Sequence, residues 1–439
     1  MKKILIYLFA LANLAVIFYI WLQSSGDAFV NGGLLVKIMV LGRLSGLLAV
    51  FFILSQLILI GRVAWVEKIF GLDKLSRVHH YNGFLALFFL ALHPIFLTIG
   101  YAGLSETSFF SQYWIFITEW EDVIGGLIGL LLFLSVVILS VALIKKRLKY
   151  EFWYFTHLFT YVAIFFAFGH QLEVGTDLQT NLGNAYWIGL YIFALANFLI
   201  FRFGRIFYNY LKHDFYVDRI IKETDDAVSI YIKGKNFGKF KIQSGQFMIF
   251  RFLSRGYFYE AHPFSLSNCP NGKELRITVK NAGDFTAKVK NINQGTKVLI
   301  DGPNGIFTEQ MLKNDKVLFI AGGVGITPIR SLAESLVKKG KDISLIYGNR
   351  TKKDIIFLNE LEKLCELKHF PIFHVLSNQE SWTGMKGRID IEKVKTLAPD
   401  YKERDIYLCG PPVMMESIKK QLKADGYNLN NLHFEKFSL

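Results

Sequence analysis

Long apolar segments lie almost entirely in the first half of this 439-residue chain, and they constrain the fold more than any other feature. A helix needs about 20 residues to cross a bilayer, and six segments approach or exceed that length. They are residues 4–22, 34–60, 79–100, 122–144, 153–170 and 185–206. We therefore expect a membrane α-helical bundle of six transmembrane helices, followed by a soluble half.

The basic residues of the loops predict the orientation of this bundle. Lys and Arg precede the first segment, follow the second, fourth and sixth, and are absent from loops 23–33, 101–121 and 171–184. By the positive-inside rule, both termini and the soluble half are expected in the cytoplasm, with the bundle in the plasma membrane. The first segment is either a cleaved signal peptide or a retained helix. Its length and the lack of a small-x-small cleavage site favour retention.

Two of the apolar segments contain paired histidines. One reads RVHHYNGFLALFFLALHPI, with His79, His80 and His93, and the other reads WYFTHLFTYVAIFFAFGHQ, with His157 and His170. A single histidine in such a helix is more often a packed polar residue, but ionisable groups in hydrocarbon need partners. Two levels of two imidazoles, separated by roughly 20 Å along the helices, match a pair of bis-histidine haems. We predict an inner haem on His79 and His157 and an outer haem on His93 and His170.

The spacing of the histidines differs between the two helices. The first pair is 14 residues apart and the second is 13, which leaves them about 40° and about 140° short of four helical turns. Either the second helix is distorted, with Gly169 as a candidate place, or His80 replaces His79 as the ligand. We favour His79, because it keeps both ligands of its helix on one face. A shared zinc ion is not expected, since the two levels are far apart and no carboxylate or thiolate is near either.

Charged and sulfur-containing residues narrow the functional classes. Arg43, in the second apolar segment, either snorkels to the outer surface or pairs with a propionate of the outer haem or acts at the acceptor site. The net charge of +14 does not predict nucleic-acid binding, because no basic stripe or known motif accompanies it. Cys269, Cys365 and Cys409 form no CxxC pair, so neither a cysteine-bound iron–sulfur cluster nor a disulfide scaffold is expected.

The soluble half contains two different patterns. The short runs AVSIYIKG, KFKIQSGQFMIFRF, ELRITVKN and TKVLIDGP predict a small antiparallel β-barrel. From residue 316, strands alternate with helices, which predicts an α/β domain with a parallel sheet. The expected domains are residues 1–212, 213–312 and 313–439.

A glycine-rich turn in the α/β domain is a candidate phosphate site. In KVLFIAGGVGITPIRSLAESL an apolar strand is followed by Gly322, Gly323 and Gly325, and then by Thr327 and Pro328 at the start of a helix. Glycines let the backbone approach a phosphate, and the helix N-terminus offers free N–H groups. Because this is not the GxGxxG fingerprint, the turn alone is a weak indication.

The strand that follows this helix bears on the choice between NADPH and NADH. DISLIYGNR ends without the acidic residue that binds an NAD ribose, and Arg350, Lys352 and Lys353 follow it. This pattern favours the 2′-phosphate of NADPH. NADH and a merely solvated basic loop are the alternatives.

Four further motifs, EAHPFSLSN, VKNAGDFT, IYLCGPPVMMESI and the terminal HFEKFSL, make a family resemblance recognisable. The soluble half resembles the ferredoxin–NADP reductase superfamily. Residues from about 34 to 439 resemble the ferric reductase and NADPH oxidase (NOX) group of transmembrane flavocytochromes, in a compact bacterial form. For FAD, the resemblance implies a site made of His262, Pro263, Phe264, Ser265, Lys280, Gly283 and Thr286. For the nicotinamide nucleotide, it implies Gly322, Gly323, Gly325, Thr327, Pro328, Cys409, Gly410, Pro411 and Pro412.

The resemblance also implies a reaction. Ser265 would lie near the flavin N5, and Phe437 would cover the flavin ring until nicotinamide displaces it. Electrons would pass from cytosolic NADPH through FAD and two b-type haems to an acceptor at the outer face. Dioxygen giving superoxide is the favoured acceptor, with a ferric or cupric ion or a partner protein as alternatives. A protein partner is not required, membrane lipid is the expected surrounding, and direct calcium control is not expected, since no EF-hand segment is present.

Overall fold

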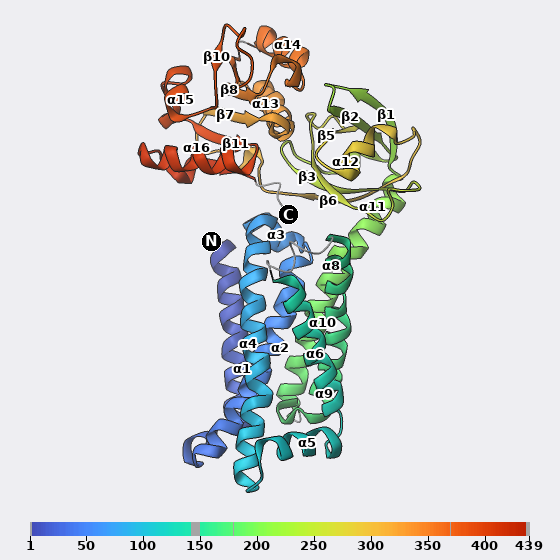
Figure 1. The fold of residues 1–439 in the computed structure, drawn as a ribbon, viewed down its shortest axis with the longest axis vertical. Coiled ribbons are helices and arrows are strands. Elements are labelled where there is room, and N and C mark those ends of the chain that lie inside the picture. The colour runs from blue at the N-terminus through green and yellow to red at the C-terminus, as the bar shows by residue number, and fades with distance from the viewer. Residues whose placement is uncertain (1, 142–149, 179, 369, 436–439) are drawn as a thin grey trace. The chain divides into compact units, whose positions relative to one another are not determined.

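The computed structural model describes residues 2–141, 150–178, 180–368 and 370–435, which form two compact units (Figure 1). The first unit comprises Met1–Val66 and Lys74–Leu199. The second comprises Glu67–Asp73 and Ile200–Leu439. A seven-residue piece between two apolar helices is therefore part of the second unit.

The first unit is helical. Its elements are α1 (Lys2–Asn31), α2 (Leu34–Ile60), α4 (Leu72–Leu104, entering from the second unit), α5 (Phe109–Glu119), α6 (Val123–Ser140), α8 (Tyr150–His157), α9 (Phe159–Val174), η1 (Thr176–Leu178) and α10 (Asn181–Leu199). Among the described residues, six helical stretches are long and apolar enough to cross a membrane: Lys2–Asn31, Leu34–Ile60, Leu72–Leu104, Val123–Ser140, Phe152–Val174 and Asn181–His213. Over their described residues, the six predicted segments are thus confirmed as helical.

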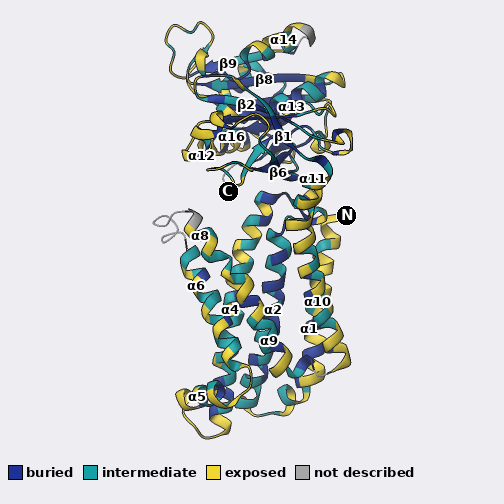
Figure 2. Cartoon of the chain, turned by 90° about the vertical axis from the view of Figure 1, so that its right-hand side faces the viewer, coloured by how far each residue is buried: buried dark blue, intermediate teal, exposed yellow. Residues whose placement is uncertain are grey.

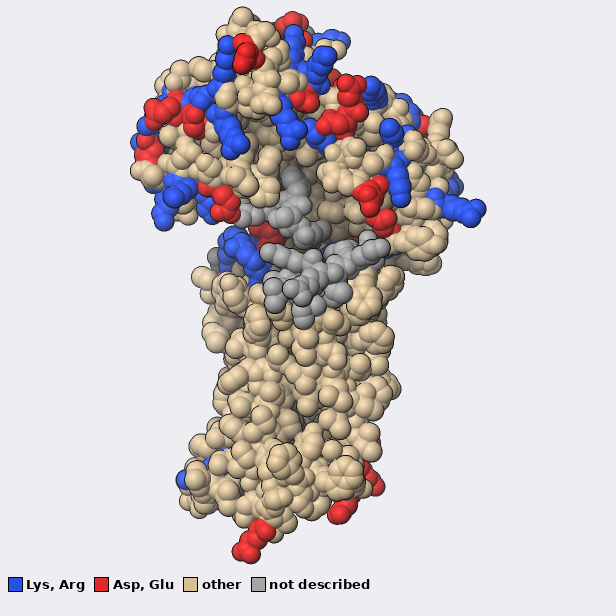
Figure 3. All heavy atoms as spheres, viewed as in Figure 1, with Lys and Arg blue, Asp and Glu red and all other residues tan. Residues whose placement is uncertain are grey.

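Helix α2 supplies more of the buried residues of this unit than any other helix, whereas α1 exposes much of its length (Figure 2). Trp21 of α1 packs with Val40 and Leu47 of α2, and its indole N–H donates to the Val40 carbonyl at 2.9 Å. Large apolar side chains such as Phe165 and Tyr81 remain exposed on the outside. The visible face of this unit bears few charges (Figure 3). Such a surface is unfavourable in water and suits hydrocarbon.

The helix that contains the second histidine pair is interrupted at Leu158, between α8 and α9. Tight bonds replace the regular ladder there: Leu158 N–H donates to the Phe155 carbonyl and Tyr161 N–H to the Leu158 carbonyl. The hydroxyl of Thr160 donates to the His157 carbonyl at 2.8 Å. A turn with three residues rotates the chain further per residue than an α-helical turn does. It therefore compensates for part of the angle by which His157 and His170 fall short of four full turns. The distortion is therefore at Leu158, and the suggestion of Gly169 was wrong, since Gly169 lies within the continuous α9.

The second unit begins with the end of α3 (Ala64–Phe70), the π-helical turn η2 (Ile200–Gly204) and α11 (Arg205–His213). Its first group of strands is β1 (Tyr216–Lys222), β2 (Ala227–Lys233), β3 (Phe247–Phe252), β4 (His262–Ser265), β5 (Leu275–Lys280) and β6 (Val298–Asn304). Between them lie η3 (Phe237–Lys239), α12 (Asp284–Lys288) and η4 (Val289–Asn291). Asn209 of α11 donates to the carbonyls of Ile300 and Gly302, which ties this helix to β6.

These strands form two antiparallel sheets of three strands, in the orders β1-β2-β5 and β4-β3-β6. Single bridges, Tyr216 to Lys297 and Leu266 to Ile277, join the sheet edges. The antiparallel prediction is confirmed, but the described strands show two bridged sheets and no closed barrel. Register shifts, such as the one beside Val217 in β1, interrupt the ladders that would make the barrel continuous.

The second group of strands forms one sheet of six, in the order β10-β9-β8-β7-β11-β12. Its strands are parallel, as the sequence predicts. The strands are β7 (Lys316–Gly322), β8 (Asp342–Asn349), β9 (Ile372–Leu376), β10 (Met385–Lys386), β11 (Asp405–Cys409) and β12 (Leu432–Phe434). The helices are η5 (Glu309–Met311), η6 (Gly323–Gly325), α13 (Ile326–Lys338), η7 (Lys352–Asp354), α14 (Leu358–Lys368), α15 (Ile391–Leu397), η8 (Tyr401–Glu403), α16 (Pro412–Ala424) and η9 (Leu429–Asn431). Apolar clusters cover both faces of this sheet.

Candidate functional site

His93 of α4 and His170 of α9 face each other across the first unit. Their ring centroids are 6.2 Å apart, with an angle of 76° between the ring planes. The Nδ1–H of His93 donates to the Gly42 carbonyl at 2.9 Å, and that of His170 donates to the Asp122 carbonyl at 3.1 Å. Because a carbonyl oxygen only accepts, both Nδ1 atoms carry the proton, and Nε2 of each ring is left as a metal ligand.

Two glycines make room for these rings. A Cβ atom on Gly46 of α2 would lie 2.6 Å from the Nδ1 of His93. A Cβ atom on Gly126 of α6 would lie 2.9 Å from the ring of His170. Each imidazole is therefore held between a carbonyl acceptor and the backbone of a neighbouring helix.

A cavity of about 220 Å³ surrounds this outer pair. Its lining is mostly apolar and aromatic, and includes Phe116 of α5 and Leu127 of α6. Arg43 of α2 also lines it, together with Asp177 of η1. Asp177 is buried and accepts a hydrogen bond from Ser24 of α1. Arg43 thus lines the same cavity as the outer histidines, as expected if it acts near them. Asp177, which the sequence analysis did not single out, lines the cavity too.

His79 of α4 and His157 of α8 form a second facing pair. Their ring centroids are also 6.2 Å apart, with an angle of 56° between the planes. His80 is exposed and packs edge-on against Phe84, with centroids 5.0 Å apart. The structure therefore places His79, and not His80, opposite His157.

The polar neighbours of this inner pair differ from those of the outer pair. The Nδ1 of His79 is buried without a hydrogen-bond partner, and the Nδ1 of His157 lies 3.4 Å from the Ser140 hydroxyl. Trp153 donates its indole N–H to that hydroxyl at 3.0 Å. Among the described residues, no group of three or more His, Cys, Asp or Glu is arranged to hold a metal ion. Each pair thus supplies two imidazoles and no further ligand of that kind.

Strand β4 carries the predicted HPFS motif. Ser265 at its end is 5% exposed, and its hydroxyl is buried without a partner. The ring of His262 stacks on Phe285 at 3.9 Å and its Nε2 pairs with Glu260 at 2.9 Å. Pro263 and Phe264 hold the strand in register with β3. Buried hydroxyl groups are normally hydrogen-bonded, so the Ser265 hydroxyl is placed to bond to a ligand.

The predicted segment from Lys280 to Thr286 is a turn leading into α12. Lys280 pairs with Asp226 at 3.2 Å. The Thr286 hydroxyl accepts from the Ala282 N–H and donates to the Gly283 carbonyl, so it closes the turn. Because Phe285 stacks on His262, this turn lies beside strand β4. The two segments assigned to one cofactor are therefore adjacent.

The two predicted nucleotide turns pack directly against each other at the carboxyl ends of β7 and β11. A Cβ atom on Gly325 would lie 2.3 Å from the Cys409 carbonyl, and one on Gly410 would lie 3.1 Å from the Gly322 Cα. The carboxyl edge of a parallel sheet is where nucleotides bind in such folds. Within the first turn, Gly323 has φ +52°, and its carbonyl accepts from the Tyr347 hydroxyl at 3.0 Å.

Thr327, Pro328 and Pro411 complete these turns. Thr327 donates its hydroxyl to the Val324 carbonyl at 3.0 Å, and Pro328 is buried in the first turn of α13. Pro411 caps α16, and Pro412 is its first residue. Arg350 is exposed immediately after β8, and the amide of the preceding Asn349 is buried with neither of its polar atoms paired.

Glu435 is a candidate residue that the sequence analysis missed. It follows β12, is 8% exposed, and its Oε2 has no partner. Burial raises its pKa well above the ordinary value, and Asp73 and Glu67 add to the rise. Burial likewise raises the pKa of the Cys409 thiol, and Glu435 contributes there too. A carboxyl group kept protonated in this way can donate a hydrogen bond at neutral pH.

Glu67 holds the loop beside Glu435. Its Oε1 accepts from the Gly305 N–H at 2.7 Å, and burial raises its pKa against the opposing effect of that bond. Gly305 has φ +94°, and a Cβ atom there would lie 2.8 Å from Glu435 Oε1. The only sequence signals for this cluster were two acids, Glu435 in the terminal HFEKFSL and Glu67 between the second and third apolar segments.

Phe437, the predicted flavin cover, lies outside the described residues.

Three family descriptions match consecutive parts of the chain. Residues 45–168 match the ferric reductase like transmembrane component, residues 217–308 an FAD-binding domain, and residues 319–420 the oxidoreductase NAD-binding domain. The chain therefore has the architecture of the ferric reductase-like and NOX group, with a flavin and nicotinamide half of the ferredoxin–NADP reductase type. Its domains are those of an NAD(P)H-dependent oxidoreductase.

Curated relatives match parts of the chain. The glycine betaine monooxygenase reductase subunit of Pseudomonas aeruginosa is 33% identical over 154 residues, which are 34% of this chain and 42% of the relative. NADH-cytochrome b5 reductase 1 of Kluyveromyces lactis is 34% identical over 161 residues, 35% of this chain and 57% of the relative. The chain thus spans about two fifths to three fifths of the length of these two relatives.

Two similar solved structures cover about half of the chain. The flavohem-like FAD/NAD-binding domain of nitric oxide dioxygenase from Vibrio cholerae is 25% identical, with a TM-score of 0.46, and covers 50% of this chain and 97% of that one. A ferredoxin NADP+ reductase from Neisseria gonorrhoeae with bound FAD and NADP is 18% identical, with a TM-score of 0.45, and covers 51% and 98%.

Proposed function

We propose that this chain carries electrons from cytosolic NADPH, through FAD and two b-type haems, to an acceptor at the outer face of the plasma membrane. The observation that carries the proposal is the presence of two facing histidine pairs with the same 6.2 Å ring separation in a ferric reductase-like bundle. Two iron–imidazole bonds of about 2 Å each, added to the distances from ring centre to nitrogen, give roughly 6 Å. Among the described residues neither pair has a third His, Cys, Asp or Glu grouped with it, so each pair would hold a haem through its two imidazoles.

The residues of the chain have distinct roles in this proposal. His79 and His157 would hold one haem, and His93 and His170 the other. The buried hydroxyl of Ser265 and carboxyl of Glu435, each with an unpaired oxygen, would face the flavin. When bound, FAD accepts a hydride and releases electrons singly, and bis-histidine haem transfers them without binding the acceptor directly. Cys409, with its raised pKa, remains a neutral thiol beside the nicotinamide turn.

We propose dioxygen as the acceptor, with superoxide as the product. The supporting feature is Arg43, whose cation lines the cavity of the outer histidines. A fixed positive charge favours an acceptor that becomes an anion on taking one electron, and disfavours a free ferric or cupric cation. Asp177 in the same cavity opposes this effect in part. A metal ion and a protein partner are therefore the competing outcomes of the test.

The acceptor test uses the purified full-length protein with its cofactors. NADPH oxidation is followed while cytochrome c reduction, with and without superoxide dismutase, and ferric-chelate reduction are measured in parallel. We expect dismutase to abolish most of the cytochrome c reduction. If dismutase has no effect while the ferric chelate is reduced at the rate of NADPH oxidation, dioxygen is the wrong acceptor.

The basic loops and Arg350 carry the remaining parts of the proposal. The Lys and Arg residues in alternate loops support a cytoplasmic location of both termini and the second unit, where NADPH is available. The exposed Arg350 at the end of β8 would pair with the 2′-phosphate of NADPH. Arg350→Ala should lower kcat/KM for NADPH about tenfold, or by roughly 1.4 kcal/mol, and leave that for NADH almost unchanged. Equal losses with both nucleotides would remove the argument for NADPH.

A further inference from the structure

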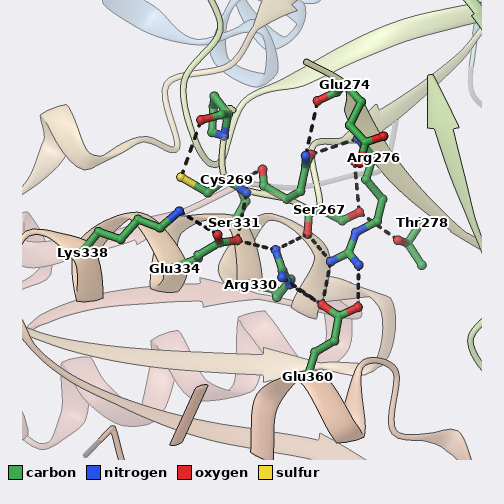
Figure 4. A network of polar contacts seen from close by, with 12 residues as sticks. Ser267, Cys269, Glu274, Arg276, Thr278, Arg330, Ser331, Glu334, Lys338 and Glu360 are labelled. Carbon is green, nitrogen blue, oxygen red and sulfur yellow. Dashed lines mark hydrogen bonds and ion pairs between the residues drawn. The ribbon is translucent and has the colours of Figure 1, made fainter. Parts of the chain in front are cut away.

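Two arginines from different domains of the second unit converge on one carboxylate (Figure 4). Arg276 belongs to β5 of the flavin-type sheets, and Arg330 belongs to α13 of the nucleotide-binding domain. Their common partner is Glu360 of α14. Glu360 is thus one side chain through which both domains are joined.

The contact between Arg276 and Glu360 has two hydrogen bonds. Nη1 lies 2.6 Å from Oε1, and Nη2 lies 3.1 Å from Oε2. Arg276 is only 3% exposed, and its guanidinium lies over the ring of Phe357 at 4.5 Å. Such a forked, charge-assisted contact fixes orientation as well as distance.

Phe357 adds a sign of constraint at this contact. It is buried and has φ +64°, a left-handed conformation that bulky residues rarely adopt. A strained residue persists only where its surroundings over-determine it, and such residues cluster at functional sites. Here Phe357 directly precedes α14, the helix that carries Glu360 to its contacts with Arg276 and Arg330.

The same arginines hold the chain that follows the flavin motif. Arg276 Nη2 and Arg330 Nη1 both donate to the Ser267 carbonyl, at 2.8 and 3.1 Å. The Ser331 hydroxyl donates to the Asn268 carbonyl at 2.7 Å. A further bond runs from the Cys269 N–H to Glu334 Oε2 at 3.2 Å. Three successive backbone groups after β4 are therefore attached to the helix that follows the nucleotide turn.

The connections from this network to the two predicted cofactor segments are short. Ser265 precedes Ser267 by two residues, and Arg330 follows Gly325 by five. Donor and acceptor must approach to about 3–3.5 Å for an efficient reaction, and a misplacement of about 1 Å can reduce the rate about a hundredfold. A contact that fixes these two segments relative to each other therefore also fixes the geometry of hydride transfer.

We propose that Glu360 is a positioning residue, which clamps the flavin strand and the nucleotide turn at the separation needed for hydride transfer. The inference rests on the proposed function, in that NADPH reduces a flavin bound near Ser265. Glu360 touches neither cofactor segment directly and acts through Arg276 and Arg330. Its loss alters the rate of flavin reduction rather than the affinity for NADPH.

The kinetic test compares Glu360→Gln with Glu362→Gln in the full-length holoprotein. Glu362 is an exposed carboxylate on the same helix and serves as the matched control. Rapid anaerobic mixing with NADPH measures the dissociation constant and the limiting rate of FAD reduction separately. We expect Glu360→Gln to lower the limiting rate about tenfold or more, with less than about a twofold change in affinity. Glu362→Gln should match the wild type, and Glu360→Asp should recover part of the rate.

A second measurement does not depend on activity. Amide hydrogen exchange of residues 266–276 and 326–338 should be faster in Glu360→Gln than in the wild type, and unchanged in Glu362→Gln, because local opening exposes those amides. Unchanged exchange with an unchanged limiting rate would overturn the clamp. A loss confined to NADPH affinity would also overturn it. If NADPH fails to reduce the flavin of the wild-type protein, the proposed function fails instead, and the exchange result still tests the clamp.

Discussion

The inner and outer histidine pairs have the same ring separation and very different surroundings. At the outer level both Nδ1 atoms donate to backbone carbonyls. Two glycines there let the helix backbones approach the rings closely. At the inner level one Nδ1 has no partner and the other lies 3.4 Å from a serine hydroxyl. Partners of this kind fix the orientation and basicity of a ligating imidazole. Under the proposed function, these contacts hold the outer imidazoles in place before a haem binds, and the predictions below test how far the inner level differs.

The largest difference should follow from removing one inner ligand. His79→Ala should abolish binding of the inner haem, so that neither haem is reduced after NADPH reduces the flavin, because the first step of the electron path is gone. His80→Ala is the matched control, since its ring is exposed and packs against Phe84. In both variants, haem content measures haem binding, and anaerobic haem spectra after addition of NADPH measure haem reduction. Loss of one haem in His80→Ala, with none lost in His79→Ala, would reverse the assignment.

Removing one outer ligand should have a smaller effect on the early part of the path. His93→Ala is expected to reduce the haem content from two to one per chain, while NADPH still reduces the flavin and the inner haem. Delivery of electrons to the acceptor should fall sharply. The measurement is haem content together with the amplitude of haem reduction. Retention of two haems would show that His93 is not a ligand.

The tight packing of the outer level can be tested without changing a ligand. Gly46→Ala places a methyl group 2.6 Å from an imidazole atom that its carbonyl partner holds in place. Overpacking of this kind costs about 1–3 kcal/mol, so outer-haem affinity should fall about tenfold. Gly189→Ala, in α10 with open space around its Cβ, is the control. Haem titration of both variants decides the matter, and equal affinities would mean that the outer level is not rigid.

The smallest effect is expected at the inner level. Ser140→Ala removes the 3.4 Å contact to His157 and the acceptor for Trp153. A weak hydrogen bond worth about 0.5 kcal/mol corresponds to roughly 20 mV in the potential of a one-electron couple. Redox titration of the two haems should show that shift in one haem only, with haem content unchanged. A shift in both haems, or loss of a haem, would show that the inner pair is held as firmly as the outer one.

Sequence reasoning succeeded where a local pattern carries the information. The six apolar segments, the two histidine-bearing helices and the parallel sheet after residue 316 were all predicted, because hydropathy and periodicity are local properties. The two turns with glycine and proline motifs were also expected from the sequence, and the structure has a turn and a helix start at each; their nucleotide-binding role stays a prediction. Their packing against each other, seen at Gly325 and Cys409, follows from the order of strands β7 and β11.

Other features could not be read from local patterns. The position of the helix distortion, at Leu158 rather than Gly169, depends on which side-chain hydroxyl replaces a backbone donor. Glu435, Asp177 and Glu67 are acids whose sequence neighbours give no sign of burial. Their environment is made by residues far away in the chain, such as Gly305 for Glu67.

The sequence by itself determined that this chain has an apolar six-helix half with two levels of histidines and a soluble half with flavin- and nucleotide-type motifs, because each of these is encoded in residue spacing. Only the tertiary structure decided which histidines face each other, that glycines and carbonyls hold the outer pair, and that Glu360 joins two domains. Facing rings, packing distances and shared ion pairs depend on how separate segments come together, and residue spacing along one segment does not specify that.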